Sequence, residues 1–305
     1  MVEPLPPTAT ADLPPDWSTI SHDLVCPLCT YNLRGLIDPR CPECGYTFTW
    51  SALQEACRAA HPYLFEHYPH RTLWSFTRTT RAGFRPSSFW SRLSPAHRIH
   101  TNRLLLYWLV HTALLLIAAA AVFGIAFYTT ISSLNTTRAS ARAIATAGGM
   151  FSQQWLNLVY PPPGSWRWLK SVSNSVNPEL IPFVGLLLLW PWLTFLSLLI
   201  FQQSMRKSRI RPAQIFRCCI YAGDAALPIF LAILAFNFLT IVQFPATQNI
   251  QLDLLPFIFL LYASYRLLIA YKTYLRFDHV IATILASQII VALIGWKLVF
   301  IWAQN

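Results

Sequence analysis

Long runs of apolar residues, separated by short polar segments, fill the last two thirds of this chain. They cover residues 104–128, 181–202, 218–243, 254–271 and 280–302, and the fourth is the shortest. Because an α-helix rises about 1.5 Å per residue, about twenty residues cross a hydrocarbon core about 30 Å thick. A chain in lipid must satisfy its own backbone hydrogen bonds, so each run is predicted to be helical. The pattern predicts an all-α membrane bundle with about five transmembrane helices.

Composition and charge support the same class. Apolar residues make up 55% of the chain and charged residues 11%, whereas a soluble domain is about a quarter charged. The formal net charge is +11, and the cations mostly flank the apolar runs. This placement fits control of membrane topology and contact with anionic lipid better than binding of nucleic acid.

The loops predict an orientation in a cell membrane. Residues 203–217 carry five Lys or Arg and no acid, residues 272–279 carry Lys272 and Arg276, and residues 244–253 carry no Lys or Arg. The positive-inside rule places the N-terminus and the two basic loops in the cytoplasm and the C-terminus outside. The start of the sequence, M-V-E-P-L-P-P, has no basic segment followed by an apolar run. We therefore expect no cleavable signal peptide, and the first span acts as the insertion signal.

Four cysteines form two closely spaced pairs before the first span. The sequence reads Cys26-Pro-Leu-Cys29, then eleven residues, then Cys41-Pro-Glu-Cys44-Gly45. Two such knuckles joined by a β-hairpin can hold a structural zinc ion (Zn2+) in a tetrahedral site made of four cysteine thiolates. Gly45 can take the left-handed conformation after the second knuckle, and Thr30 stands at the matching place in the first. A unit this small depends on its metal for folding.

Other uses of these cysteines are less well supported. A redox dithiol pair and an iron site use similar spacings. A zinc ion with four protein ligands has no open position, so catalysis at this metal is not expected. Nucleic-acid binding is not favoured, because Arg34 and Arg40 are matched by Asp38 and Glu43. A structural module, or one that contacts a cytoplasmic protein partner, fits the residues better.

An arginine- and aromatic-rich segment follows the ribbon. If residues 70–85 are helical, Leu73, Phe76, Thr80 and Phe84 fall within about 80° of one another. Four arginines lie on the other side: Arg71, Arg78, Arg81 and Arg85. This pattern predicts an amphipathic helix in the membrane interface, with these arginines binding lipid phosphates. The alternative is a short helix packed on the ribbon with solvated arginines.

Three histidines in the same segment raise the question of a second metal site. His61, His67 and His70 are separated by two prolines, so their spacing does not place them on one helix face. Interfacial polar residues are the simpler interpretation. The expected organisation is a disordered tail over 1–20, a zinc ribbon over 21–50, the arginine-aromatic segment over 51–103 and the membrane domain over 104–303.

Two charged residues lie inside the predicted spans. Asp224 is in the third and Arg266 in the fourth, at similar depth on the cytoplasmic side. An intramembrane charge indicates a functional or paired residue, so we predict an ion pair between them. The alternative is that Arg266 extends to the interface while Asp224 is protonated or pairs with Arg217. Single polar residues in the spans are expected to form interhelical hydrogen bonds: His111, Asn237 and Gln288.

These residues suggest a family resemblance. The stretch C-P-L-C-T-Y-N-L-R-G-L…R-C-P-E-C-G-Y-T-F resembles an N-terminal zinc ribbon common in certain bacterial membrane proteins. R-A-G-F-R-P-S-S-F-W and the last pair of apolar runs resemble the Yip (Ypt-interacting protein) domain family, over roughly residues 75–303. The resemblance implies a cytoplasmic N-terminal arm and five spans. Eukaryotic members act in vesicle trafficking and membrane shaping. The long outer loop at 129–180 departs from the family's compact pattern.

The function these features favour is a non-enzymatic membrane scaffold or adaptor. The sequence has no metalloprotease, P-loop or serine-nucleophile motif. The ribbon would recruit a cytoplasmic protein while the bundle contacts the lipid bilayer. The main alternative is a small-solute or ion transporter that uses Asp224, and a membrane enzyme has the least support.

Overall fold

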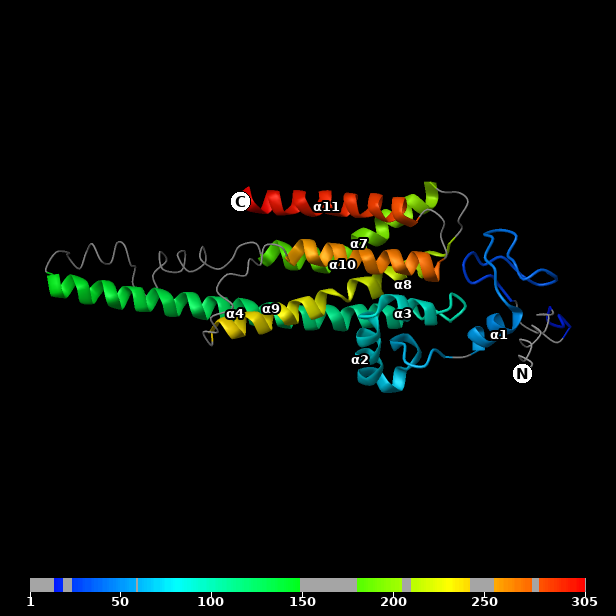
Figure 1. Ribbon diagram of the computed structural model, residues 1–305, viewed down its shortest axis with the longest axis horizontal. Helices are drawn as coiled ribbons and strands as arrows, with labels where there is room; N and C mark the ends of the chain where they lie inside the picture. The colour runs from blue at the N-terminus through cyan, green and yellow to red at the C-terminus, as the bar shows by residue number, and fades with distance from the viewer. Residues whose placement is uncertain are drawn as a thin grey trace, which may run out of the picture. The chain divides into compact units, whose positions relative to one another are not determined.

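The computed structural model describes residues 14–18, 24–58, 60–148, 180–204, 210–241, 255–275 and 280–304, and nearly all of its regular structure is helical (Figure 1). No β-strand occurs among these residues. The helical elements are α1 (Trp50–Arg58), η1 (Phe65–His67), η2 (Pro69–Arg71), α2 (Thr72–Gly83), α3 (Pro86–Arg92), α4 (Thr101–Gly148), α7 (Leu180–Ser204), α8 (Pro212–Gly223), α9 (Ala226–Ile241), α10 (Leu255–Ile269), η5 (Ala270–Tyr274) and α11 (Val280–Gln304).

Four helical segments of the described chain are long and apolar enough to cross a membrane. They are Thr101–Ile144, Phe183–Phe201, Pro212–Ala232 and Val280–Lys297. The fourth predicted run, 254–271, corresponds to α10, which has 15 residues and is followed by the π-helical turn η5. At about 1.5 Å per residue, α10 alone extends about 22 Å, less than the hydrocarbon thickness. The structure thus indicates a multi-pass membrane protein with four candidate spans.

Helix α4 does not end where its apolar run ends. It has 48 residues and continues to Gly148, so the prediction that an outer loop begins at residue 129 is wrong. Residues 125–147 contain no glycine or proline, and Ser and Thr hydroxyls in this stretch donate to carbonyls three or four residues earlier, as Thr137 does to Ser133. These bonds let polar residues remain in the helix. Residues 149–179 of the predicted loop lie outside the described part of the chain.

The third predicted span is divided at Asp224 and Ala225, where α8 ends and α9 begins. Pro228 lies four residues after Asp224, and a proline ring displaces the carbonyl of the fourth residue before it. This is the physical reason for the interruption, and the sequence predicts a kink at Pro228. The last turn of α8 consequently has backbone carbonyls available to side chains.

The chain divides into two compact units. The second contains His111–Leu188, Ala226–Phe259 and Trp296–Asn305, and in it the rings of Phe183 and Phe230 stack at 5.8 Å. The first contains Met1–Val110, Leu189–Ala225 and Leu260–Gly295. The cysteine pairs and the buried residues Arg217, Asp224 and Arg266 all belong to this first unit.

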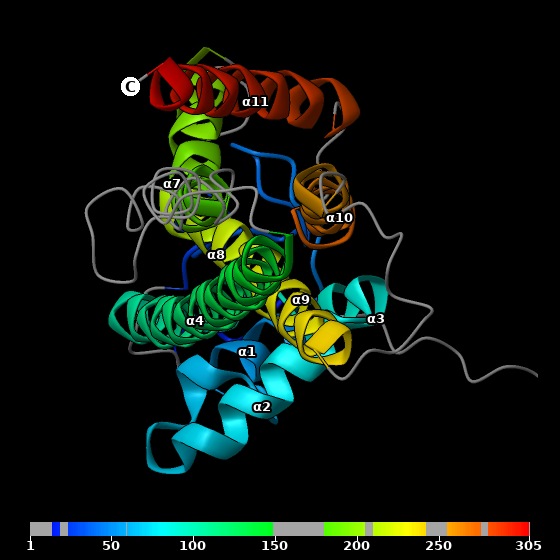
Figure 2. The same cartoon turned by 90° about the vertical axis from the view of Figure 1, so that its left-hand side faces the viewer.

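Buried aromatic rings form the core of the first unit. Trp90 of α3 contacts Tyr274 of η5 at 5.3 Å, and Tyr107 of α4 contacts Tyr221 of α8 at 5.2 Å between ring centroids. All four side chains are buried. Helices α2 and α3 follow one another in the chain and contact each other with their axes in different directions (Figures 1 and 2). The arginine-aromatic segment is therefore packed onto the ends of the apolar helices.

Gln288 of α11 joins three helices of this unit. Its Oε1 accepts hydrogen bonds from Trp190 Nε1 of α7 at 3.0 Å and from Ser264 Oγ of α10 at 3.3 Å. Its amide donates to Thr194 of α7 at 3.4 Å. The prediction that Gln288 forms interhelical hydrogen bonds is confirmed. His111 is buried in α4, and the side chain of Asn237 lies outside the described part.

Candidate metal centre and buried polar network

The two cysteine knuckles have the same backbone hydrogen bonds at equivalent positions. Cys26 N–H donates to the Tyr31 carbonyl at 2.8 Å, and Cys41 N–H donates to the Tyr46 carbonyl at 2.9 Å. Each knuckle is closed by one isolated antiparallel bridge, Val25 with Asn32 and Arg40 with Thr47. The predicted β-hairpin is therefore not formed as strands in this part of the structure. The knuckles themselves hold the cysteines in place.

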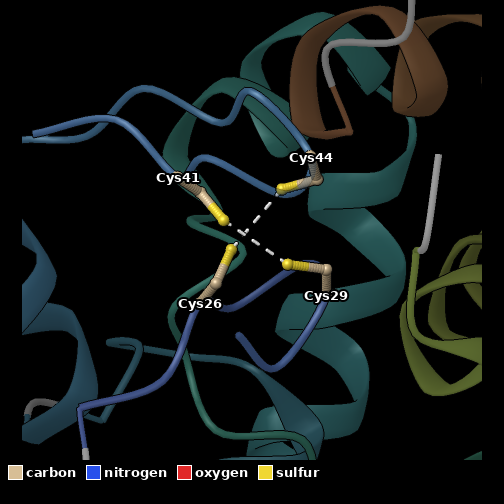
Figure 3. Close-up of side chains that lie close together, drawn as sticks. All are labelled: Cys26, Cys29, Cys41 and Cys44. Carbon is tan, nitrogen blue, oxygen red and sulfur yellow. Dashed lines mark hydrogen bonds between the residues drawn. The ribbon is translucent and has the colours of Figure 1, made fainter. Parts of the chain in front are cut away.

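The four sulfur atoms converge on one point (Figure 3). Cys26 Sγ lies 3.6 Å from Cys44 Sγ and Cys29 Sγ lies 3.5 Å from Cys41 Sγ, and all four atoms are within 4.8 Å of one another. Sulfurs at about 2.3 Å from a tetrahedral ion would be about 3.8 Å apart. The four cysteines therefore fit a single metal ion. Of the residues that the structure describes, no other group of three or more His, Cys, Asp or Glu could hold one.

Protonation links this cluster to metal binding. Burial raises the pKa of the Cys29 thiol to about 12, and the neighbouring thiols act in the same direction. Four adjacent thiolates would repel one another, and a divalent cation removes that repulsion while displacing the protons. Metal affinity should accordingly weaken as the pH falls.

Thr30 is strained, and its replacement provides a test of the knuckle geometry. Its φ is 66°, in the left-handed region, and Gly45 has φ 74° at the equivalent position. A β-branched residue there costs about 1 kcal/mol more than glycine. We expect Thr30→Gly to tighten metal binding about fivefold, measured by competition with a coloured chelator.

Gly45→Ala is the matched opposite change and should weaken binding by a similar factor. An ideal Cβ at Gly45 would meet its nearest side-chain atom, Arg40 Nη2, at an ordinary 3.7 Å, so the cost comes from the backbone conformation. Equal affinity of the wild type and both variants would contradict the role of the left-handed residue.

The first knuckle is attached to the start of α8. Arg211 N–H donates to the Leu28 carbonyl at 2.7 Å. The Gln214 side-chain amide donates to the carbonyls of Pro27 at 3.0 Å and Pro95 at 2.9 Å. Pro27 and Leu28 are the two residues between Cys26 and Cys29. The metal centre is therefore hydrogen-bonded to a candidate membrane-spanning segment.

A buried ion pair continues this connection. Arg217 Nε donates to Glu66 Oε1 at 2.8 Å, and neither side chain is exposed to solvent. Arg217 also donates to the Tyr274 hydroxyl at 2.8 Å, and that hydroxyl donates to Gln214. Glu66 further accepts from the Tyr221 hydroxyl at 3.2 Å. We call these five residues the buried polar network: Glu66, Gln214, Arg217, Tyr221 and Tyr274.

Sequence reasoning missed this network. The sequence pattern assigns no role to Glu66, and it gives Arg217 as a loop charge or as an alternative partner for Asp224. One signal was present, because Glu66 is the only acid between residues 60 and 103. A lone carboxylate among arginines is a natural partner for a buried cation.

Asp224 and Arg266, the predicted intramembrane pair, are brought together by the structure. Arg266 Nη1 forms an ion pair with Asp224 Oδ1, and both side chains are nearly fully buried. The Tyr107 hydroxyl donates to Asp224 Oδ2 at 2.8 Å, and Arg266 Nη2 donates to the Tyr221 carbonyl at 2.6 Å. That carbonyl lies in the last turn of α8, before the interruption at Asp224. Arg266 therefore binds both the Asp224 carboxylate and a backbone carbonyl next to the helix interruption.

Exchange of the two charges tests this pair. Asp224→Arg alone places two guanidinium groups together, and we expect a loss of about 3–5 kcal/mol of stability. The double variant Asp224→Arg/Arg266→Asp restores opposite charges and should recover much of the loss. Size-exclusion chromatography in detergent would measure the fraction of monodisperse protein. Two defects that do not rescue one another would show that the pair is not a unit.

The face through which helix α2 packs on the rest of the protein only partly overlaps its predicted apolar side. Its buried residues are Ser75, Phe76, Thr79 and Gly83. Leu73 is 83% exposed and Phe84, just after the helix, is 51% exposed, although both belong to the predicted apolar side. A Cβ at Gly83 would lie 2.5 Å from Arg266 Nη2, so α2 approaches the ion pair closely where it has no side chain. The four predicted lipid-binding arginines are all exposed: Arg71, Arg78, Arg81 and Arg85.

Four histidines gather near the buried polar network, but they are not the three considered from the sequence. The backbone N–H of His61 donates to His67 Nδ1 at 2.8 Å. The ring centroid of His97 lies 5.4 Å from that of His61 and 6.0 Å from that of His67. His100 contacts His67 at 5.9 Å, whereas His70 is exposed. His67 uses both ring nitrogens, since Nε2 bonds to the Arg98 carbonyl at 2.8 Å.

This cluster predicts that stability depends on pH. Burial, together with the nearby charges of His97, His67, Arg217 and Arg92, lowers the pKa of His61 from 6.5 to about 4. The unfolded chain then binds a proton that the folded chain does not, so stability should fall as pH decreases from about 6.5 toward about 4. The midpoint of thermal unfolding, followed by tryptophan fluorescence, would measure this.

Two variants separate His61 from other titrating groups. His61→Phe should reduce the slope of the pH profile but not remove it, because burial also lowers the pKa values of His67 and His97. His70→Phe, which changes an exposed residue outside the cluster, is the control. Identical slopes in the wild type and the His61 variant would contradict the assignment.

The described helices and the cysteine cluster define a multi-pass membrane protein with a candidate metal centre joined to its apolar helices. No protein-family model, curated protein or solved structure matches this chain.

Proposed function

We propose that this protein is a non-enzymatic membrane scaffold or adaptor, in which a zinc ribbon is held rigidly against the membrane domain. The observation that carries the proposal is the bonding of the first knuckle to α8 through the Leu28 and Pro27 carbonyls. A module fixed in this way can transmit position and force between a cytoplasmic partner and the bilayer. The proposed relationship to the Yip family fits this role.

Zinc is the metal that suits the donor set best. Four thiolates in tetrahedral arrangement select zinc over harder cations, and a closed set of four protein ligands serves structure rather than catalysis. Cys26 and Cys41 are buried and Cys29 and Cys44 are half-buried, which supports a structural ion. Zinc would supply the folding free energy that a module this small lacks.

The proposed topology has five spans with a cytoplasmic N-terminus. Helix α10 contains 15 residues and η5 contains 5, so the two together approach the length of a span. Residues 211–217 contact both the ribbon, through Pro27 and Leu28, and Tyr274, and the positive-inside rule assigns all three segments to the cytoplasmic side. These contacts support the predicted orientation, with the C-terminus outside.

The exposed segment between the two knuckles, together with the second knuckle, is the proposed contact surface for a protein partner. Ile37, between the two knuckles, is 78% exposed, and Pro42 within the second knuckle is also exposed. An exposed isoleucine at this position is available to pack into a pocket of a partner. The transporter alternative has less support, because the carboxylate of Asp224 is engaged by Arg266 and Tyr107.

Site-specific photo-crosslinking in cells tests the adaptor proposal. A photoreactive residue at position 37 of the full chain should yield one discrete protein adduct, and Cys44→Ser in the same chain should abolish it. A photoreactive residue at position 73, where Leu73 is exposed on α2, is the matched control and should not yield that adduct. An adduct that persists without Cys44, or no protein adduct at all, would overturn the proposal.

A further inference from the structure

Residues of α2 and α3, together with Tyr63 before η1, line an open basic cavity that the adaptor role does not use. The cavity has a volume of about 450 Å3. Four arginines line it: Arg78, Arg81, Arg85 and Arg92. Its size lies within the range of small-ligand sites and exceeds what one or two ordered waters need.

No acidic side chain lines the cavity. Glu66 is the only acid between residues 60 and 103, and its carboxylate is already paired with Arg217. Asp224, behind α2, is paired with Arg266. The positive charge of the four guanidinium groups is therefore not balanced by an acidic side chain of the cavity.

The remaining lining groups match a phosphate ester attached to an apolar body. Guanidinium groups bind phosphate oxygens through paired N–H donors. Ser88 and Tyr63 add hydroxyl groups, and Phe84 and Phe89 add apolar surface on the cavity wall. Arg92 and Tyr63 both line the cavity, so a cation and a hydroxyl group are available there to a phosphate.

The position of the cavity relative to the apolar helices points to lipid. The back of α2 lies against the Asp224–Arg266 pair through Gly83, and Asp224 is within the candidate span Pro212–Ala232. Leu73 and Phe84 are exposed beside the arginines, and Leu109 of α4 is 53% exposed. Arginines next to outward-facing apolar side chains are typical of the headgroup region of a bilayer.

We propose that the α2–α3 cavity binds the phosphate-bearing headgroup of an anionic lipid. The acyl chains would extend along the exposed apolar side chains of this segment. The inference uses the membrane location of the protein and does not depend on the adaptor role.

Native mass spectrometry of the full chain in detergent, with phosphatidic acid titrated in, tests the proposal. Wild-type protein should retain phosphatidic acid in a saturable way and should not retain phosphatidylcholine. Arg81→Gln/Arg85→Gln should weaken retention about thirtyfold, since two interfacial arginines are lost. Arg142→Gln/Lys272→Gln removes the same charge from exposed positions that do not line the cavity and should retain the lipid.

Three outcomes would overturn the proposal. Equal weakening in both double variants would show diffuse attraction of a basic surface. Equal retention of phosphatidylcholine would show that the cavity does not select a headgroup with a net negative charge. Binding of inorganic phosphate that depends on Arg81 and Arg85, without retention of phosphatidic acid, would assign the cavity to a soluble anion. Circular dichroism of each variant would confirm that the helices are intact.

Discussion

Glu66→Ala is expected to lower the free energy of unfolding by about 3–5 kcal/mol, because it leaves the Arg217 guanidinium buried without a counter-ion. Both side chains of the pair are 0% exposed. The change also removes the acceptor for the Tyr221 hydroxyl and for the His100 N–H. Unfolding in detergent, followed by tryptophan fluorescence with increasing denaturant, would measure the loss.

Two further variants distinguish the ion pair from a general effect of losing a carboxylate. Glu55→Ala removes an exposed acid from α1 and should change stability by less than about 0.5 kcal/mol. Glu66→Gln/Arg217→Met removes both charges while keeping an acceptor and similar volumes, and should recover most of the loss. A Glu66→Ala variant as stable as Glu55→Ala would show that the buried polar network contributes little.

Removal of zinc is expected to unfold the ribbon. Structural zinc in small modules contributes about 10–16 kcal/mol of apparent binding free energy at neutral pH. We expect elemental analysis to find a single zinc ion per chain. Chelation, or Cys44→Ser, should abolish hydrogen-exchange protection of the knuckle amides of Cys26, Thr30, Cys41 and Gly45, which are hydrogen-bonded in the structure. The Arg211 amide should lose protection with them because its acceptor is Leu28.

Cys57→Ser is the control, since Cys57 is outside the quartet. It should bind zinc as the wild type does. Iron in place of zinc after purification would support the alternative metal. Unchanged exchange of the knuckle amides after complete chelation would show that the ribbon folds without any ion.

Sequence analysis located the parts of the site whose geometry is set by residues close together in the chain. Each Cys-x-x-Cys pair sits on a single turn, so spacing alone places two sulfurs together. The left-handed conformations at Thr30 and Gly45 follow from the same turns. Asp224 and Arg266 are distant in sequence, but both are charges that lipid disfavours, and depth in the membrane limited the possible partners.

Hydrophobicity was a weaker guide to where helices end. The apolar run ending at 128 marks the lipid-facing part of α4, but alanine-rich polar sequence continues the same helix to Gly148. The fourth run forms a 15-residue helix and a π-helical turn rather than a full span by itself. Helix ends depend on caps and breaking residues more than on polarity. The resemblance to the Yip family stays a prediction.

Composition and spacing by themselves determined the class of protein, the cysteine quartet and the existence of the apolar helices, because each of these follows from contacts with the solvent or with near neighbours in the chain. Only the tertiary structure decided that Glu66 meets Arg217, 151 residues away, that Gln214 holds the first knuckle, and that α2 buries Gly83 while its arginines line a cavity. Those arrangements depend on how the arm packs against α8 and η5. A helical pattern gives the faces of α2 but not which face a neighbouring helix will cover.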